Sequence, residues 1–206
     1  MRFIPLLAAP FLLALLALAH NRETGEEPKK VTIQGVVRNP GGGPLGGVEV
    51  TVWVLGKQDS VASVTTEQAD GSHKLVNLEL SATYDIAYTH SRYQPTWLQH
   101  LATGKDQTIS KVMYLRGEKM PAQAANEAIQ SAEDIYMFAL SLEKSARRPF
   151  LARFIRGDPG DLRNATLGVS SLSVVDANND VARWLDLRRR DFLNRVQAIK
   201  LDGPGE

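Results

Sequence analysis

Four valines at alternate positions are the feature that most constrains the fold. They are Val48, Val50, Val52 and Val54, and the residues between them are Glu49, Thr51 and Trp53. Successive side chains of a β-strand point to opposite sides of its sheet, so a period of two residues puts the valines on one face. The sequence therefore predicts a strand that buries its valine face in a core.

Runs of the same kind recur from residue 31 to residue 115. Clusters of glycine, proline, asparagine and aspartate separate them, and such clusters favour turns. The other runs are VTIQGVVR, SVASVTTE, HKLVNLEL, TYDIAYTH and TISKVMYL. About seven short strands with this spacing predict an antiparallel, Greek-key β-sandwich over residues 31–116.

The period changes after Gly117. Apolar residues then recur at steps of three and four, the repeat of an α-helix with one buried face. We expect a first helix that Pro149 ends, a short one at 150–155, a third from Asp158-Pro159 to Leu172, and a last one at 181–199. Residues 117–206 thus form a helical C-terminal region, and the fold class is an all-β sandwich followed by α-helices, α+β overall.

Residues 1–19 have the anatomy of a secretory signal peptide. Arg2 gives a positive start, residues 3–18 are apolar, and Ala17-Leu18-Ala19 is a small-x-small cleavage site. A retained membrane anchor is the alternative, but the apolar stretch is short for a bilayer, which needs about 20 residues. We expect cleavage after Ala19, a flexible lead at 20–30, a secreted or periplasmic protein, and no membrane span after cleavage.

Charge and cysteine content narrow the choice of partner. The chain has 24 Lys and Arg against 23 Asp and Glu, a formal net charge of +1. Such a balance gives no electrostatic footprint for nucleic acid. The chain has no cysteine, whereas small exported domains of eukaryotes are usually held by disulfides, so a bacterial envelope protein is favoured.

The order of short motifs in the β region points to a known family. A G-x-V step at 35–37 precedes GPLGGVEV at 43–50, TTEQADGSHKL at 65–75, YDI at 84–86, Tyr93 with Pro95, and VMYL at 112–115. In this order the chain resembles the carboxypeptidase regulatory-like domain, over about residues 31–116. The resemblance departs at Ser72-His73, where an aromatic step is usual, and at Arg92, where glycine usually precedes tyrosine.

The resemblance implies a transthyretin-like β-sandwich that acts as a binding or spacer module, without catalysis of its own. In that fold Asp70-Gly71 would supply the positive-φ turn of a two-residue hairpin. Gly46-Gly47 would turn the chain into the valine strand. The helical region resembles no family that we can name.

No motif in the sequence supports an enzyme, a metal site or a cofactor. His20 and Glu23 have zinc-ligand spacing but precede the first strand. The glycines at 41–46 lead into a strand rather than a helix, which excludes a dinucleotide loop. Residues 176–180 begin like a calcium loop but lack its glycine and glutamate, so we interpret them as a cap between helices. We interpret Glu133-Asp134 as solvated charge.

The stretch HSRYQPTWLQH at 90–100 supplies the candidate ligand-binding residues. They are Tyr93, Trp97, Gln99 and His100. An aromatic ring with flanking amides can stack on a sugar and bond its hydroxyls, which would make the protein a carbohydrate-binding module. Packing of Trp97 against the helices is the favoured alternative, and metal binding by His90 and His100 is the least favoured.

The leading interpretation is a non-enzymatic exported binding module with an unknown protein or glycan partner. Trp53 and Leu55 point away from the buried valines and need a cover, which the helices can provide. We therefore expect a monomer in which the helices close on the sandwich. The alternative is an envelope scaffolding protein that assembles through these helices.

Overall fold

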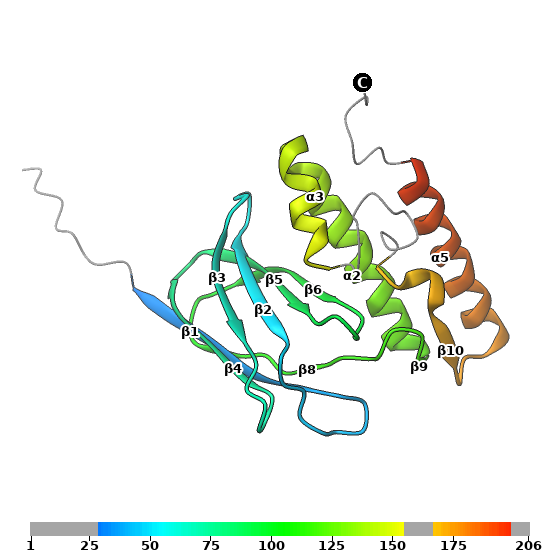
Figure 1. Cartoon of the computed structure of the whole chain (residues 1–206), viewed down its shortest axis with the longest axis horizontal. Helices are drawn as coiled ribbons and strands as arrows, with labels where there is room; N and C mark the ends of the chain where they lie inside the picture. The colour runs from blue at the N-terminus through cyan, green and yellow to red at the C-terminus, as the bar shows by residue number, and fades with distance from the viewer. Residues whose placement is uncertain (1–28, 155–166, 199–206) are drawn as a thin grey trace, which may run out of the picture.

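The computed structural model describes residues 29–154 and 167–198. The predicted signal peptide, most of the flexible lead, and Asp158-Pro159 lie outside the described residues. Within them, a β-sandwich is followed by three α-helices, so the predicted α+β fold class is confirmed (Figure 1).

Two four-stranded sheets form the sandwich. In the first, β1 (Lys30–Arg38) pairs antiparallel with β4 (Ser72–Glu79) and parallel with β7 (Gln107–Thr108) and β8 (Lys111–Val112). The second has the order β3-β2-β5-β6, with all neighbours antiparallel. Its strands are β3 (Ser60–Thr65), β2 (Glu49–Val54), β5 (Thr83–Thr89) and β6 (Thr96–Ala102). The parallel pairs at the β1 edge depart from the purely antiparallel sandwich that we expected.

The valine face of β2 lies in the core between the sheets, as predicted. Val48, Val50 and Val52 have no exposed surface, and Val54 is partly buried. On β5, which pairs with β2, three fully buried side chains share the same core, namely Tyr84, Ile86 and Tyr88. Burial of β-branched and aromatic side chains from both strands stabilises the sandwich.

The turn at Asp70-Gly71 has the predicted backbone but not the predicted topology. Gly71 has φ +71°, and a Cβ there would lie 2.3 Å from the Val37 carbonyl oxygen, so only glycine fits. The strands on either side, β3 and β4, belong to different sheets. The turn is therefore a crossover between sheets, and the prediction of a two-residue hairpin is wrong.

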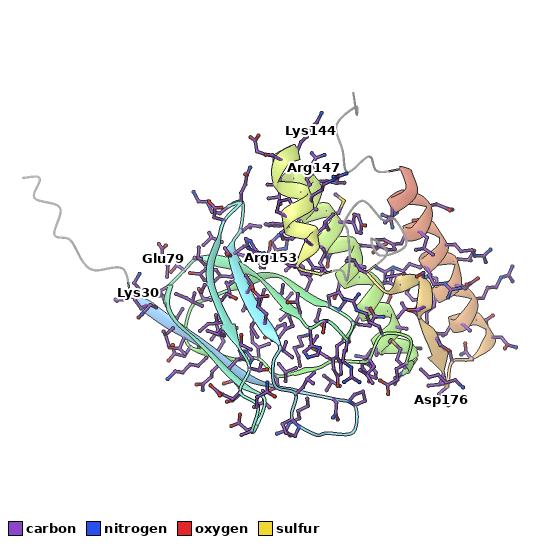
Figure 2. The ribbon with its side chains drawn as sticks, viewed as in Figure 1. Lys30, Glu79, Lys144, Arg147, Arg153 and Asp176 are labelled. Atoms are coloured by element: carbon purple, nitrogen blue, oxygen red, sulfur yellow. The ribbon has the colours of Figure 1, made fainter. Side chains whose placement is uncertain are left out.

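The helical region begins with α2 (Ala122–Ser141) and α3 (Lys144–Ala152). The break between them lies at Leu142-Glu143, whose backbone is extended. The Arg147 guanidinium donates to the carbonyls of Leu140 and Leu142 at 3.0 and 3.2 Å, which satisfies acceptors that a helix end leaves free. Figure 2 shows Arg147 on α3.

Pro149 lies inside α3, so the prediction that it ends a helix is wrong. Proline removes one donor, the one that would bond the carbonyl four residues earlier, at Ser145. Ser145 is exposed, so water can reach that carbonyl. Burial of Phe150 and Leu151 on the other face favours the helix.

Residues 169–175 also differ from the expected helix. A short 3-10 helix, η1 (Val169–Ser171), leads into β10 (Ser173–Val175). That strand pairs parallel with β9 (Lys119–Pro121), the segment just before α2. Val169 and Leu172 are buried as the predicted stripe required, but the backbone that buries them is not α-helical.

The last helix, α5 (Asn179–Ala198), packs against α2 on the side away from the sandwich (Figure 1). The Asn178 side chain accepts from the Val181 N–H at 2.9 Å, so the capping role predicted for this loop is confirmed, although a strand rather than a helix precedes it. The predicted Asp186–Arg190 and Asp191–Arg195 ion pairs are present at 2.7 and 3.1 Å. None of the helices in the described residues has the length and apolar character needed to cross a membrane.

Candidate functional site

Trp97 lies inside the molecule rather than on its surface. Its side chain is 4% exposed, and its ring packs against Trp53 of β2 and against rings of both α2 and α3. Those rings are Phe138 of α2 and Phe150 of α3, and Phe154, just after α3, packs against the same indole. A ring enclosed in this way cannot stack on a sugar from outside. The packing alternative for Trp97 is therefore the one that the structure supports.

This aromatic seam is where the helices cover the second sheet. Trp53 is 1% exposed, as expected for a residue under the helices, and the Arg153 guanidinium lies 5.9 Å from its ring centroid. Leu55 is 46% exposed, so the expectation that the helices also cover it is wrong. Because β2 ends at Val54, Leu55 lies beyond the covered part of the strand.

The other three candidate residues lie apart from the Trp97 ring. Tyr93 bridges to Leu115, and its ring packs edge-on against His90, with centroids 5.0 Å apart. Gln99 and His100 are exposed at a bulge of β6, where His100 has φ +55° and its N–H donates to Asp85 at 2.9 Å. The four candidates therefore do not line one surface.

Burial also favours the neutral form of His90, at the start of this stretch. Desolvation, with the nearby Arg92 as a smaller cause, lowers the pKa of His90. The backbone N–H of Arg92 donates to His90 Nδ1 at 3.2 Å, which leaves Nε2 as the protonated nitrogen of the neutral ring. His90 and Tyr93 thus form a packed corner beside the seam.

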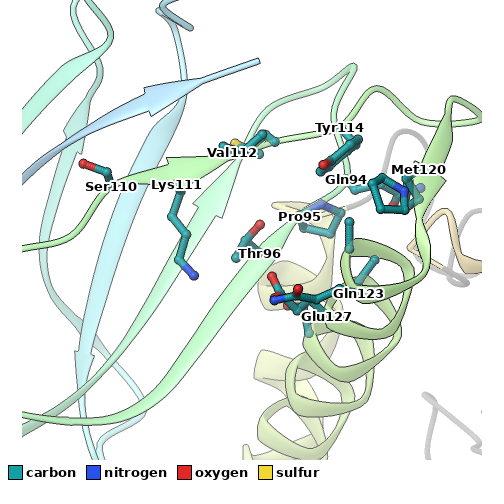
Figure 3. A pocket seen from close by; sticks show the side chains of 15 residues that line it. Gln94, Pro95, Thr96, Ser110, Lys111, Val112, Tyr114, Met120, Gln123 and Glu127 are labelled. Carbon is teal, nitrogen blue, oxygen red and sulfur yellow. The ribbon is translucent and has the colours of Figure 1, made fainter. Parts of the chain in front are cut away.

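A groove of about 380 Å³ lies between the open edge of the sandwich and α2 (Figure 3). One wall is the stretch Ser110–Tyr114, which contains β8, and another is Gln94–Thr96 at the start of β6. The third wall is the first half of α2 with the end of β9. The groove therefore exists only because the helices stand against the sandwich.

Buried side chains form the inner surface of this groove. Met113 and Met120 are 1% and 0% exposed, and Ser131 lies beside them on α2. Ser131 Oγ accepts from the Trp97 N–H at 3.1 Å, which ties α2 to the edge of β6. The Gln94 amide donates to the Gly168 carbonyl at 3.2 Å, so this wall is also fixed to the segment before η1. The inner surface is thus held by the core.

The mouth of the groove carries opposite charges on opposite walls. Lys111 reaches from the β8 wall, while Gln123 and Glu127 project from α2 (Figure 3). Gln123 donates to the Glu127 carboxylate at 3.0 Å, and in the part of the chain that the structure describes neither Lys111 nor Glu127 has an ion-pair partner. Both charges are therefore available to a polar ligand.

The sequence located this groove only in part. Gln94, Pro95 and Thr96 fall within the stretch 90–100, but the residues predicted to bind a ligand there were Tyr93, Trp97, Gln99 and His100. The sequence did not predict the α2 wall of the groove, because Gln123 and Glu127 are the kind of residues found on any solvated helix face. Only the tertiary contact of α2 with β6 brings the two segments together.

Among the charged residues, Glu133 differs from its predicted role as a solvated side chain. Its carboxylate binds Arg188 at 2.6 Å and Arg195 at 2.5 Å, and its side chain is only 15% exposed. Burial also raises the pKa of the neighbouring Asp134 carboxyl. The prediction of solvated charge is therefore wrong for Glu133, which joins α2 to α5.

No site for a metal emerges from residues 29–154 and 167–198, where no three His, Cys, Asp or Glu side chains come together as ligands. His20 and Glu23 lie outside the described residues.

No family model matches the chain, and a search of curated proteins found no match. Some solved structures resemble part of it. A streptococcal ancillary pilin is 14% identical with a TM-score of 0.31, over 42% of this chain and 32% of the pilin. A C-terminal fragment of a pilus adhesin from Lactobacillus rhamnosus GG is 12% identical with a TM-score of 0.34, over 43% and 46%.

The dioxygenase domain of a dioxygenase–carbohydrate-binding protein fusion from Streptomyces sp. SirexAA-E is a third such structure. It is 16% identical with a TM-score of 0.32, over 45% of this chain and 84% of that domain. The chain spans less than half of the length of the pilin and of the adhesin fragment. Likeness at this level does not transfer a function, so the function has to be argued from the site.

Proposed function

We propose that the protein is a non-enzymatic, exported binding module that holds its ligand in the groove between β8 and α2. The observation that carries the proposal is the groove itself, whose inner surface is fixed by the core and whose mouth presents Lys111, Gln123 and Glu127. A largely preformed concave site with a few convergent polar groups is the usual form of a binding site. The predicted signal peptide supports the exported location.

The finer assignment of the sandwich belongs to the same proposal. The motif order at 31–116 resembles the carboxypeptidase regulatory-like domain, and the two-sheet architecture is compatible with it. Domains of that family act as binding or spacer modules, which agrees with a ligand groove and with the absence of a catalytic motif from the sequence. The family assignment rests on the motifs alone.

The proposal is tested by filling the groove. Ala128 lies in its α2 wall, so Ala128→Trp should occupy the space and abolish binding. Met137→Trp is the matched control, since Met137 is on the same helix, is exposed and does not line this groove. Protein of residues 20–206 would be screened against a glycan array and a random peptide library. Binding lost only in Ala128→Trp supports the proposal, and binding equal in all three proteins contradicts it.

A scaffolding role is the second candidate, and one observation favours it. Val181, Trp184 and Leu187 of α5 recur at three-residue steps and are 36%, 50% and 54% exposed. Large apolar side chains that are exposed next to one another form a surface that often marks a protein interface. Light scattering of the full chain decides this role. A dimer that Leu187→Glu dissociates would support scaffolding, and a monomer would remove it.

A further inference from the structure

The edge of β8 faces the groove with free backbone groups. The N–H groups of Ile109 and Met113 donate to carbonyls of β1, those of Gln34 and Arg38, at 2.7 and 2.9 Å. Alternate residues of a strand turn their backbone groups to opposite sides. Ser110 and Val112 therefore turn their N–H and C=O groups away from β1, into the groove that they line.

Among the residues that the structure describes, the N–H and C=O groups of Ser110 and Val112 have no neighbouring strand to pair with. In the described part of the chain β8 pairs with β1 alone, and Val112 is 49% exposed. Next to this free stretch, the Tyr114 carbonyl does have a partner, because it accepts from the Gln94 N–H at 2.8 Å. On the C-terminal side the unpaired edge therefore ends at Tyr114, where the groove also ends. An open strand edge is a template on which another extended chain can pair.

We propose, on the basis of the function proposed above, that the ligand is an extended peptide segment of another protein, which adds as a strand along Ser110–Val112. The main chain of the peptide would bond the free edge, in the manner of strand addition. Its side chains would alternate between the inner surface of the groove and its mouth, because successive residues of a strand face opposite sides.

The groove also sets the side chains that such a peptide should carry. Pro95 and Tyr114 offer apolar surface to small apolar residues. At the mouth, Glu127 on the α2 wall would attract a basic residue, and Lys111 on the β8 wall an acidic one. A glycan would use the same polar groups but has no use for a row of alternating backbone donors and acceptors. The free edge therefore favours a peptide.

Proline at position 112 tests the edge directly. Val112→Pro removes the N–H that points into the groove and none that bonds β1, and proline is tolerated at strand edges. Val112→Ala is the matched control, because it removes the same apolar side chain but keeps the N–H. The probes are a displayed library of random peptides of about six residues, the common strand length, and a glycan array.

The result expected is that peptides are enriched on the wild type and on Val112→Ala, and that Val112→Pro binds the same peptides about tenfold more weakly. Melting temperatures close to the wild type would show that both variants fold. Peptides that lose binding in Ala128→Trp need an open groove. If such peptides bind Val112→Pro as well as Val112→Ala, that result would overturn strand addition and leave the proposed function standing. Groove-dependent binding of glycans alone would do the same. Ligands that bind Ala128→Trp as tightly as the wild type would overturn both proposals.

Discussion

The indole rings of Trp53 and Trp97 lie with their centroids 5.2 Å apart and their planes inclined by 31°. Trp53 belongs to β2 and Trp97 to β6, and the β5 strand lies between them in the sheet. Phe150 of α3 packs against both rings, with centroids 5.7 and 6.0 Å away. The pair is the surface on which the helices rest, so the sandwich and the helices should unfold as one unit.

Truncation of Trp97 should therefore destabilise the whole chain. Trp97→Ala leaves a cavity between the sheet and two helices, and we expect a loss of about 3–5 kcal/mol in the free energy of unfolding. Trp184→Ala is the control, since Trp184 is half exposed on α5, and we expect a change of less than about 1 kcal/mol. Urea unfolding followed by circular dichroism measures both. Equal losses in the two variants would show that Trp97 does not carry the seam.

The contact between Ser131 and the Trp97 backbone should matter more than its small size suggests. Ser131→Ala removes the acceptor of the buried Trp97 N–H, and leaving such a donor unpaired costs about 1–3 kcal/mol. Ser141, which is exposed on the same helix, supplies the control Ser141→Ala. Thermal unfolding with the same midpoint for Ser131→Ala and the wild type would contradict this role.

Glu133 should stabilise the packing of α5 on α2. Glu133→Gln keeps the shape but removes the charge that faces Arg188 and Arg195, and we expect a loss of about 1–3 kcal/mol because both partners would keep their charge at a half-buried position. Asp191→Asn removes an exposed pair to the same Arg195 and should cost less than about 1 kcal/mol. Chemical denaturation of both variants at low and high salt compares them. A larger loss for Asp191→Asn would refute the account.

Acid should weaken the sandwich through His73. This side chain is 5% exposed against Tyr88, and burial lowers its pKa below the ordinary value of 6.5. The unfolded chain then takes up a proton near pH 6.5 that the folded chain resists, so the free energy of unfolding falls as pH drops from that value toward the folded pKa. Above pH 6.5 both states are neutral, and His73 adds no pH dependence.

The measurement is the free energy of unfolding between about pH 7 and pH 5, where histidine titrates. His73→Gln should reduce the dependence to the part that His90 contributes, whereas His100→Asn, at an exposed position with positive φ, should leave it as in the wild type. The same slope in all three proteins would show that His73 is not the group responsible.

The two-residue repeat of apolar side chains and the residues of the turns predicted the sandwich, because both depend on interactions between neighbours along the chain. The valine face of β2 and the positive φ of Gly71 both follow from neighbours along the chain. The sequence alone suggested that the turn at Gly71 joins two paired strands of a hairpin. The two strands lie in different sheets, which only the tertiary fold decides. The helix break at Leu142 likewise depends on Arg147, whose role appears only when the two helix ends meet.

The site was harder to predict for the same reason. Trp97 was a candidate for stacking on a sugar because the sequence does not distinguish a buried aromatic ring from an exposed one. Its contacts with Trp53, Phe138 and Phe150 show that the ring is buried. The groove depends on how far α2 stands from β8, and no local pattern encodes that distance.

Backbone amide spectra of the full chain test the central claim most directly. A peptide selected from the library would be titrated into isotope-labelled protein, and the amide resonances would be followed. The account predicts that the largest changes fall on Ser110 and Val112, with smaller ones at Thr96 and Gln123 across the groove. Changes confined to the α5 face around Trp184 and Leu187, with Ser110 and Val112 unmoved, would contradict it.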